Sequence, residues 1–320
     1  MLSVANLLEI SEPWLQYALR LNLFSQRKED FVELKDDALK DPKIRGFLQD
    51  VSNFHGLIVS GHKNFALPIH KLLFLLELGL DTEIPEIKHA IAEIMTHKDK
   101  NGVYLSAVNI PLKLGCDGQD TFGWAMCDAP LLLRALCLAG VDYPKHIKQG
   151  VDTLIKTNRQ NGFPCAASDQ FGKWRGPGRK EDCCPYATLS MLKLLLATPE
   201  YRLSSITLDT AKALLDLWQT SRTSHPYMFF MGNDFRKLKV PTLWYDIVSV
   251  CDALSSVVGI HDDERFKEML QVIRDKQNAD GMFTPESIYL KLKEWDFGQK
   301  INPSPYLTYV ICRLFKQIEG

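Results

Sequence analysis

The stretch Asp182-Cys-Cys-Pro-Tyr-Ala-Thr-Leu-Ser-Met-Leu-Lys-Leu-Leu-Leu-Ala197 joins a proline to a long apolar run. Proline suits the first turn of a helix, because its φ is already helical and its missing N–H would have no partner inside the helix. The run that follows has too little polar surface for a solvated helix. The stretch therefore predicts a buried helix that begins at Pro185.

This design recurs along the chain. Five prolines, each 55 to 64 residues from the next, open an apolar stretch: Pro68, Pro130, Pro185, Pro241 and Pro305. Amphipathic stretches with a charged face lie between them and predict outer helices over 84–97, 146–158, 207–221 and 264–278. Two further helices are expected over 14–23 and 43–52. The chain therefore consists of repeated helix pairs of about sixty residues.

Stacked helix pairs form either an open solenoid or a closed barrel. Inner helices as apolar as these are easier to place around a closed axis than along a groove. The sequence therefore predicts an all-α fold, an (α/α)₆ toroid with about six inner and five or six outer helices. Residues 1–320 are expected to form a single domain, in which 1–60 supply closing helices and 61–320 the repeated pairs.

Glycines end three of the outer helices in kindred turns. Gly102, Gly162 and Gly281 each follow an asparagine or aspartate, where glycine supplies the positive φ of a helix stop. The expected fourth turn, residues 221–227, has no glycine and contains His225. That repeat has diverged, and divergence inside a repeat can indicate a functional site.

Composition excludes several classes of function. The 38 lysines and arginines nearly balance the 39 aspartates and glutamates, which leaves no basic field for nucleic acid. No apolar run approaches the length of a membrane span, and the longest candidates carry Glu77 and Arg134. The first ten residues do not resemble a signal peptide. We expect a cytoplasmic protein whose eight cysteines are reduced thiols or metal ligands.

Two turns carry a resemblance to a known family. Gln160-Asn-Gly-Phe163 and Gln277-Asn-Ala-Asp-Gly-Met-Phe283 resemble the Gln-rich, Gly-aromatic turns of squalene and terpenoid cyclases and of protein prenyltransferase β subunits. The layout from about residue 60 onward is similar to bacterial and archaeal prenyltransferase-like toroid proteins with cysteines in their middle repeats. The resemblance implies a toroid with a central cavity for an apolar, isoprenoid ligand.

The family's catalytic motifs are incomplete here. The Asp-x-Asp-Asp motif of squalene-type cyclases is absent. Asp182-Cys183-Cys184 matches the Asp-x-Cys part of the prenyltransferase zinc site, but no histidine stands at the matching start of another inner helix. The sequence therefore leaves open whether the protein is an enzyme of the terpenoid cyclase or prenyltransferase type.

Four cysteines stand in equivalent places of neighbouring repeats. Cys127 and Cys184 open inner helices, while Cys116 and Cys165 lie in the loops that precede them. Zinc commonly takes four thiolates, so these cysteines are candidate Zn²⁺ ligands, with His225 as a substitute for one thiol. Two other interpretations stay open: a small buried hydrophobe, and a reactive thiol at Cys127 or Cys184 whose pKa is lowered by the helix N-terminus.

Three aspartates stand near the first turns of successive inner helices. Asp128, Asp182 and Asp246 are candidate acids that would face the same end of a regular repeat. A carboxyl group with a raised pKa could protonate an alkene, and two together could cleave a glycosidic bond. The alternative for each is an N-terminal cap. Aromatic and histidine side chains at the same starts and loops are candidate ligand-binding residues: Trp124, Trp174, Tyr186, His225, Tyr227, Trp244, Tyr245, Tyr306 and Tyr309.

The leading hypothesis is a terpenoid cyclase or prenyltransferase-like protein whose aromatic-lined cavity holds a small apolar, isoprenoid ligand. One alternative is a carbohydrate-active (α/α)₆ enzyme that uses the inner-helix aspartates. A second is a non-catalytic binding or scaffold protein stapled by zinc. No nucleic acid partner and no membrane span are expected.

Overall fold

The computed structural model describes residues 4–56, 58–59, 61–114, 116–226, 229 and 232–319. Within them the chain is all-α, with one two-stranded sheet. Its elements are α1 (Val4–Glu9), α2 (Pro13–Asn22), α3 (Val32–Lys40), α4 (Pro42–Val51), α5 (Pro68–Glu77), α6 (Pro85–Thr96), β1 (Ser106–Asn109), β2 (Asp120–Gly123), α7 (Ala129–Leu138), α8 (Lys148–Ile155), α9 (Pro185–Ala197), α10 (Ser205–Thr220), α11 (Ile247–Leu254), α12 (Glu264–Arg274) and α13 (Pro305–Glu319).

Four of the five predicted helix starts are confirmed. Proline stands in the first turn of α5, α7, α9 and α13. The fifth is wrong, because the chain turns after Pro241 and α11 begins only at Ile247. A tight turn in which Leu243 N–H donates to Pro241 O (2.7 Å) occupies the predicted first turn. Asp246 then caps α11 by accepting a hydrogen bond from Ser249 N–H (2.9 Å).

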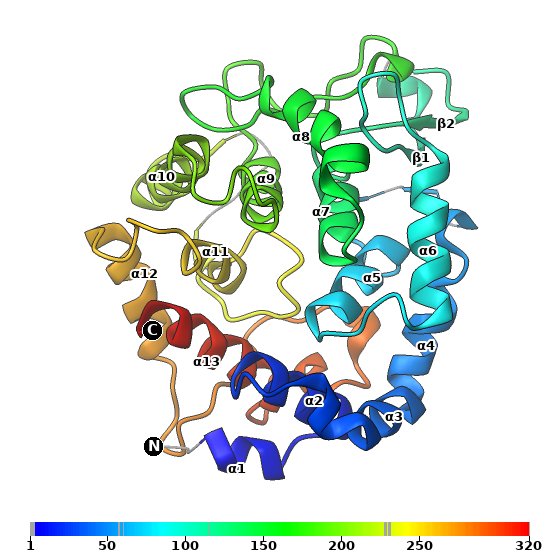
Figure 1. Cartoon of the computed structure of the whole chain (residues 1–320). Helices are drawn as coiled ribbons and strands as arrows, with labels where there is room; N and C mark the ends of the chain where they lie inside the picture. Colours follow the sequence, from blue (N-terminus) through cyan, green and yellow to red (C-terminus); the bar gives the residue numbers. More distant parts are fainter. Residues whose placement is uncertain are drawn as a thin grey trace.

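Six helices that we call the inner helices, α2, α5, α7, α9, α11 and α13, pack in series (Figure 1). Going from α5 to α13, each inner helix contacts the next, and α13 contacts α2. The Asn22 side chain at the end of α2 donates to Glu77 O (3.4 Å) and to Tyr309 Oη (2.7 Å). The amide of Asn22 thereby links α2 to both α5 and α13.

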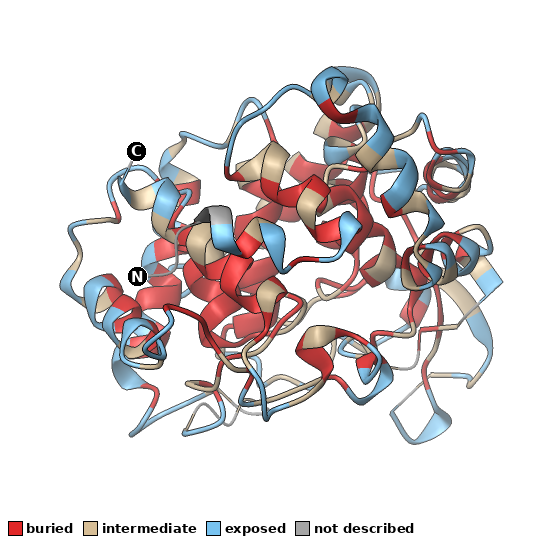
Figure 2. Cartoon of the chain, turned by 90° about the horizontal axis from the view of Figure 1, so that it is seen from below, coloured by how far each residue is buried: buried red, intermediate tan, exposed pale blue. Residues whose placement is uncertain are grey.

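Four of the remaining helices each pack on one inner helix. α4 packs on α5, α8 on α7, α10 on α9 and α12 on α11. Burial follows the same division, since α9 is almost wholly buried whereas α12 buries only one side. Buried residues gather toward the middle of the molecule and exposed ones toward its outside (Figure 2). Apolar surface removed from water contributes roughly 25 cal/mol per Å², so the buried faces of the inner helices and of the helices packed on them stabilise the core together. None of the helices in the described ranges has the length and apolarity of a bilayer-crossing segment.

The predicted glycine turns dock on the inner helices in a repeated way. Gly162 adopts φ 109°, and Phe163 N–H after it donates to Thr188 Oγ1 on α9 (3.0 Å). Gly281 adopts φ 83°, and Phe283 N–H donates to Thr308 Oγ1 on α13 (3.1 Å). Two turns far apart in the sequence thus make the same contact. In each, a phenylalanine N–H donates to a threonine that stands three residues after a helix-opening proline.

Two features did not follow from the sequence pattern. The antiparallel pair β1 and β2 lies in the long connection before α7, with Ser106 opposite Gly123. Gly123 contacts the Phe171 ring, where a Cβ would lie 2.5 Å from Cζ. Helices α1 and α3 also lie outside the predicted repeat.

Candidate functional site

Two of the three predicted aspartates are buried where inner helices begin. Asp128 precedes α7, is 3% exposed, and its Oδ1 accepts a hydrogen bond from Ala125 N–H (2.8 Å). Asp246 caps α11 and is 5% exposed. Each leaves its buried Oδ2 without a hydrogen-bond partner of normal geometry, although the Ser106 hydroxyl lies near Asp128. A carboxylate would be poorly solvated in either place.

Burial accordingly raises the pKa of both groups. Desolvation raises the pKa of Asp128 to about 7, against the effect of the backbone N–H groups around it. Desolvation likewise raises the pKa of Asp246 to about 7, although Lys239 and Lys193 favour its charged form. Near neutral pH these side chains therefore exchange a proton readily, which is the property a general acid needs. Asp182, by contrast, is half-buried in the loop before α9.

A cluster of charged residues inside the inner helices was not recognised as a site from the sequence. One comes from each of α5, α7, α9, α11 and α13, and together we call them the five-charge cluster: Glu77, Arg134, Lys193, Asp252 and Arg313. The sequence did contain one signal of this cluster, because Glu77 and Arg134 interrupt its longest apolar runs. Charges at such positions need partners, because burying an unpaired charge costs several kcal/mol.

Those partners are present. Arg134 and Glu77 form an ion pair (2.7 Å) in which each side chain is 15% exposed. Arg313 and Asp252 form a second pair (2.6 Å). Lys193 Nζ donates instead to neutral oxygens, Thr242 O (2.7 Å) and Ser249 Oγ (3.0 Å). Burial lowers the pKa of Lys193 to about 8, against the effect of Glu77 and Asp252 nearby.

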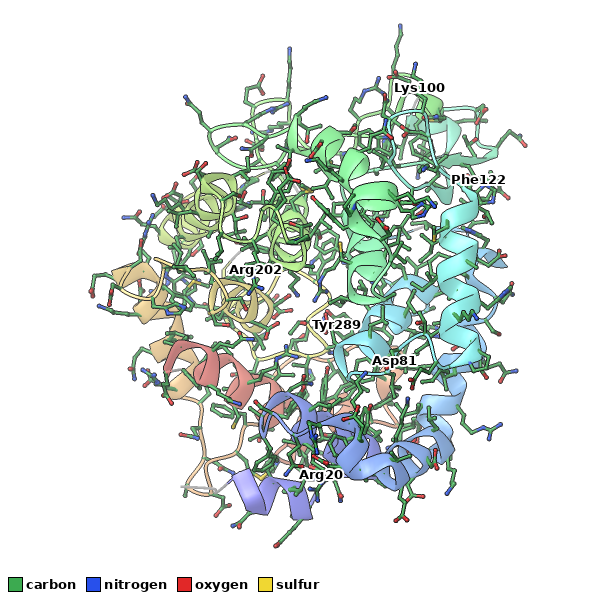
Figure 3. All side chains as sticks on the ribbon, in the orientation of Figure 1. Arg20, Asp81, Lys100, Phe122, Arg202 and Tyr289 are labelled. Atoms are coloured by element: carbon green, nitrogen blue, oxygen red, sulfur yellow. The ribbon has the colours of Figure 1, made fainter. Side chains whose placement is uncertain are left out.

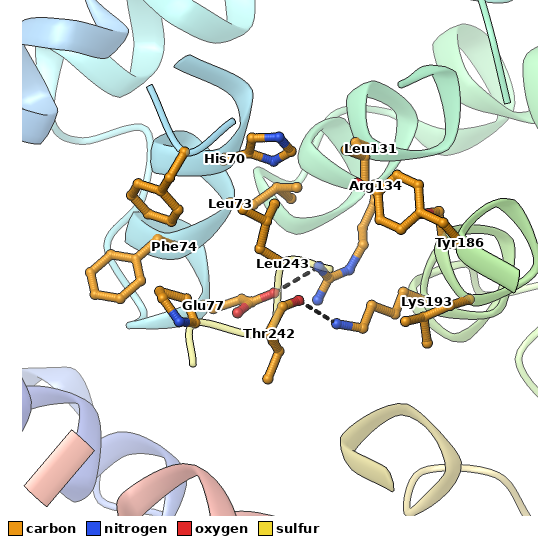
Figure 4. A pocket seen from close by; sticks show the side chains of 14 residues that line it. His70, Leu73, Phe74, Glu77, Leu131, Arg134, Tyr186, Lys193, Thr242 and Leu243 are labelled. Atoms are coloured by element: carbon orange, nitrogen blue, oxygen red, sulfur yellow. Dashed lines mark hydrogen bonds and ion pairs between the residues drawn. The ribbon is translucent and has the colours of Figure 1, made fainter. Parts of the chain in front are cut away.

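A small cavity lies beside this cluster (Figure 4). Its volume is about 30 Å³, which is room for about two water molecules. The side chains of Glu77, Arg134 and Lys193 form its polar side, and Leu243 of the 241–246 turn also lines it. Its other lining residues are Phe65, His70, Leu73, Phe74, Leu131, Tyr186, Leu189, Ser190, Pro241 and Thr242.

Two buried tyrosines lie within electrostatic reach of the aspartates. Tyr186, on α9, lines the cavity. Its pKa is raised first by burial and then by nearby charges, that of Asp128 among them. Tyr289 lies near the centre of the molecule in Figure 3, and Lys239 Nζ sits 3.7 Å from its ring centroid. Its pKa is raised well above the ordinary value, first by burial and next by the charge of Asp246. Tyr289 was not predicted as a site residue, because it lies in a loop outside the repeat pattern.

The predicted aromatic residues divide into separate groups. Tyr186 and Trp244 pack at 4.2 Å between centroids, and Phe229 joins Trp244 to Tyr245. Tyr306 and Tyr309 belong to a second group that packs with Trp14 and Phe74.

The other predicted ligand-binding residues lie elsewhere. Trp124 donates from Nε1 to Asp99 Oδ2 (3.2 Å), and Trp174 packs on Phe171 near the β-hairpin. His225 is exposed, and Tyr227 lies outside the described residues. The predicted ring of aromatic side chains is therefore not one surface. Among the predicted ligand-binding residues that the structure describes, Tyr186 alone lines the cavity, and Leu243, the sequence neighbour of Trp244, lines it as well.

Three of the four predicted zinc ligands lie near one another. Cys184 caps α9, its Sγ accepting from Ala187 N–H (3.4 Å), and it hydrogen-bonds to Cys165. Cys127 lies within electrostatic reach of both thiols, since its charge affects Cys184 and the charge of Cys165 affects Cys127. Cys116 is not in this group, because its Sγ donates to Phe171 O (3.3 Å). In the described ranges no three His, Cys, Asp or Glu side chains are grouped so as to hold a metal ion, and zinc stays a prediction.

The thiols of this group differ in acidity. The hydrogen bond from Cys184 lowers the pKa of Cys165 to about 7, with help from the Gly178 N–H and against the effect of burial. The pKa of Cys184 is raised well above its ordinary value by the same hydrogen bond and by burial. Burial also raises the pKa of Cys127. The acidic thiol is thus Cys165, whereas the sequence favoured Cys127 or Cys184.

Comparisons with known proteins include a structural neighbour. Neither a protein-family model nor a curated protein matches the chain. A crystal structure of a protein from Actinoplanes aligns with 96% of this chain and 90% of its own, at 11% sequence identity and a TM-score of 0.43.

Proposed function

We propose that the chain is an (α/α)₆ toroid of the terpenoid cyclase and prenyltransferase type, whose centre binds a small apolar ligand of the isoprenoid class. The serial packing of the inner helices, with Asn22 joining α2 to α5 and α13, supports a closed arrangement. The equivalent contacts of Phe163 and Phe283 support a repeat that runs through the chain as one domain.

The observation that carries the proposal is the pair of buried aspartates with pKa values of about 7. Asp128 and Asp246 each have one oxygen held by a backbone N–H and a second buried oxygen left over. In the protonated state such an oxygen can deliver a proton to an apolar substrate, because burial separates it from bulk solvent. We assign the acid role to these two side chains, while Tyr186 and Trp244 contribute aromatic faces that stabilise a developing cation.

The small volume of the cavity sets how a ligand enters. About 30 Å³ does not admit an isoprenoid, so binding requires displacement of the side chains that cover the cavity. Leu243 and Thr242 are the movable cover, since both are half-buried in a turn outside the helices. The fixed part is the wall formed by Leu131 and Leu189 on the packed helices α7 and α9.

Ligand binding is expected to raise the melting temperature of the full chain. Farnesol, farnesyl diphosphate and squalene are the probes, and xylohexaose tests the carbohydrate alternative. A ligand at 100 times its Kd stabilises by about 2.7 kcal/mol. Leu243→Ala enlarges the cavity and should tighten binding several-fold, whereas Leu203→Ala, at a position 73% exposed, should leave it unchanged. Failure of all three isoprenoids to shift the melting temperature of either variant contradicts the proposal.

Turnover is tested separately from binding. Any isoprenoid that binds is incubated with the protein at pH 6 and its products are separated by gas chromatography. Asp128→Asn and Asp246→Asn should bind the ligand but lower turnover at least 100-fold, because an amide cannot deliver the proton. The exposed Asp209→Asn on α10 is the matched control. Full turnover in both Asp128→Asn and Asp246→Asn would show that neither aspartate is the acid.

A second candidate function is a non-catalytic binding or scaffold protein. The small volume of the cavity favours this candidate, because a substrate would not fit without displacement of the lining side chains. A binding protein of this kind would show a ligand-induced rise in melting temperature without turnover. A pure scaffold would show no rise in melting temperature and no turnover. If a metal staple is part of it, elemental analysis of the purified protein should find about one zinc, lost on replacing Cys165 or Cys184.

A further inference from the structure

Lys193 is the only buried lysine in the described ranges, with 8% of its surface exposed. Its side chain reaches the cavity from α9 (Figure 4). The Nζ atom donates to two neutral oxygens, Thr242 O (2.7 Å) and Ser249 Oγ (3.0 Å). Among the residues that the structure describes, no carboxylate forms an ion pair with it. An ammonium group without a counter-ion is poorly solvated in such a place, so the neutral amine is favoured.

The charges around Lys193 act in the same direction. Arg134 lies on the same polar side of the cavity, and its guanidinium already pairs with Glu77 (2.7 Å). A cation beside a desolvated amine weakens the amine's hold on its proton. Burial first, and Arg134 as well, lower the pKa of Lys193 to about 8, against the effect of Glu77 and Asp252. At pH 7 roughly a tenth of a lysine with this pKa is neutral, against less than about a thousandth of an ordinary exposed lysine.

The rest of the cavity suits an apolar carbonyl compound. Leu131 and Leu189 line it from α7 and α9, so a hydrocarbon chain would pack against leucine side chains. Thr242, whose carbonyl oxygen holds Nζ, lies in the same turn as the lining residue Leu243. Displacement of this turn would therefore free the amine and open the cavity in one movement. The acid role of the buried aspartates makes no use of this amine.

We propose that Lys193 is a nucleophile that forms a Schiff base with an apolar aldehyde bound in the cavity. The Nζ lone pair attacks the carbonyl carbon, the C=O π bond breaks, and a proton passes from nitrogen to oxygen. The C–O bond then breaks and a C=N bond forms. The oxygen leaves as water, which carries both hydrogens of the amine, and nothing is oxidised or reduced. The inference rests on the proposed function, because it uses the same cavity, and it narrows the ligand to the aldehyde class.

Reductive trapping in the full chain tests the bond. The protein is incubated at pH 7 with citronellal, an isoprenoid aldehyde, and with sodium cyanoborohydride, which reduces an imine to a stable secondary amine. Trypsin does not cleave after an alkylated lysine, so the expected product is a modified peptide 181–202 in place of peptide 181–193. Lys193 should be labelled at least about tenfold faster than Lys40, whose side chain is 73% exposed.

Two comparisons show that the label depends on the folded cavity. In urea at a concentration that unfolds the chain, the preference for Lys193 over Lys40 should disappear. Leu243→Ala should label Lys193 several-fold faster, because it opens the cavity, whereas Leu203→Ala at an exposed position should leave the rate unchanged. Circular dichroism of each variant before labelling identifies a folding defect.

Citronellol, the alcohol with the same carbon chain, separates this inference from the proposed function. A rise in melting temperature with citronellol, together with labelling of Lys193 no faster than that of Lys40, would overturn the Schiff base and leave the isoprenoid site in place. Absence of both the rise and the preferential label would overturn both. Preferential labelling of Lys193 in the folded protein supports the Schiff base whether or not citronellol binds.

Discussion

Replacing Arg134 by methionine is expected to lower the free energy of unfolding by about 3 to 5 kcal/mol. The substitution leaves the Glu77 carboxylate without its ion-pair partner in a place where that side chain is only 15% exposed. Lys193 does not replace the lost partner, since its ammonium group is held by Thr242 O and Ser249 Oγ. Equilibrium unfolding in urea at pH 7.5 measures the change.

Two controls separate this effect from a loss of packing. Glu77→Met together with Arg134→Met removes both charges and should recover most of the stability, because well-packed apolar residues commonly replace a buried ion pair at little cost. Arg27→Met removes one partner of an exposed pair, in which Arg27 is 79% exposed, and should cost under about 1 kcal/mol. A loss of less than 1 kcal/mol for Arg134→Met alone would show that Glu77 is solvated in the protein.

Asp246→Asn is expected to become increasingly stabilising as the pH rises from 4 to 8. The folded protein holds the Asp246 proton up to a pKa of about 7, whereas the unfolded chain loses it near 3.8. Stability of the natural protein therefore falls with pH across this window, by about 4 kcal/mol at most for one group. Asparagine cannot ionise, so the variant escapes that loss.

The sign of this change identifies the role of the aspartate. An ordinary N-terminal cap is stabilised as a carboxylate by the helix dipole, so asparagine in its place would become relatively less favourable as the pH rises. Asp209→Asn, at an exposed position of α10, should show little dependence on pH. Urea unfolding of the three proteins at pH 5 and pH 8 measures the change. If the free energy of unfolding of Asp246→Asn, relative to the natural protein, falls from pH 5 to pH 8, Asp246 is not neutral in the folded protein.

The sequence could predict the helices because their causes are local. Proline at the start and an apolar run after it fix α9 without reference to the rest of the chain. The same rule failed at Pro241, where Asp246 provides a competing cap and Lys193 of another helix binds Thr242 O. That second contact is tertiary and leaves no trace in the local pattern.

The site was predictable only as far as it follows the repeat. Asp128 and Asp246 were predicted because they stand at equivalent helix starts. The same equivalence grouped Cys116 with the other loop cysteine, whereas the Cys116 Sγ donates to Phe171 O. The direction of a side chain in an irregular loop is set by tertiary packing, which spacing does not encode. Tyr289 was missed for this reason, although its hydroxyl is buried near Asp246.

The most direct test of the central claim is a carboxyl titration of the native protein. Carbon-13 NMR of protein labelled at the aspartate side-chain carboxyl follows each group between pH 3 and pH 9, and Asp128→Asn and Asp246→Asn assign the two signals. We predict two carboxyl groups that titrate near pH 7, one missing from each variant. If both groups titrate below pH 5, they are ionised capping residues and the acid role is wrong.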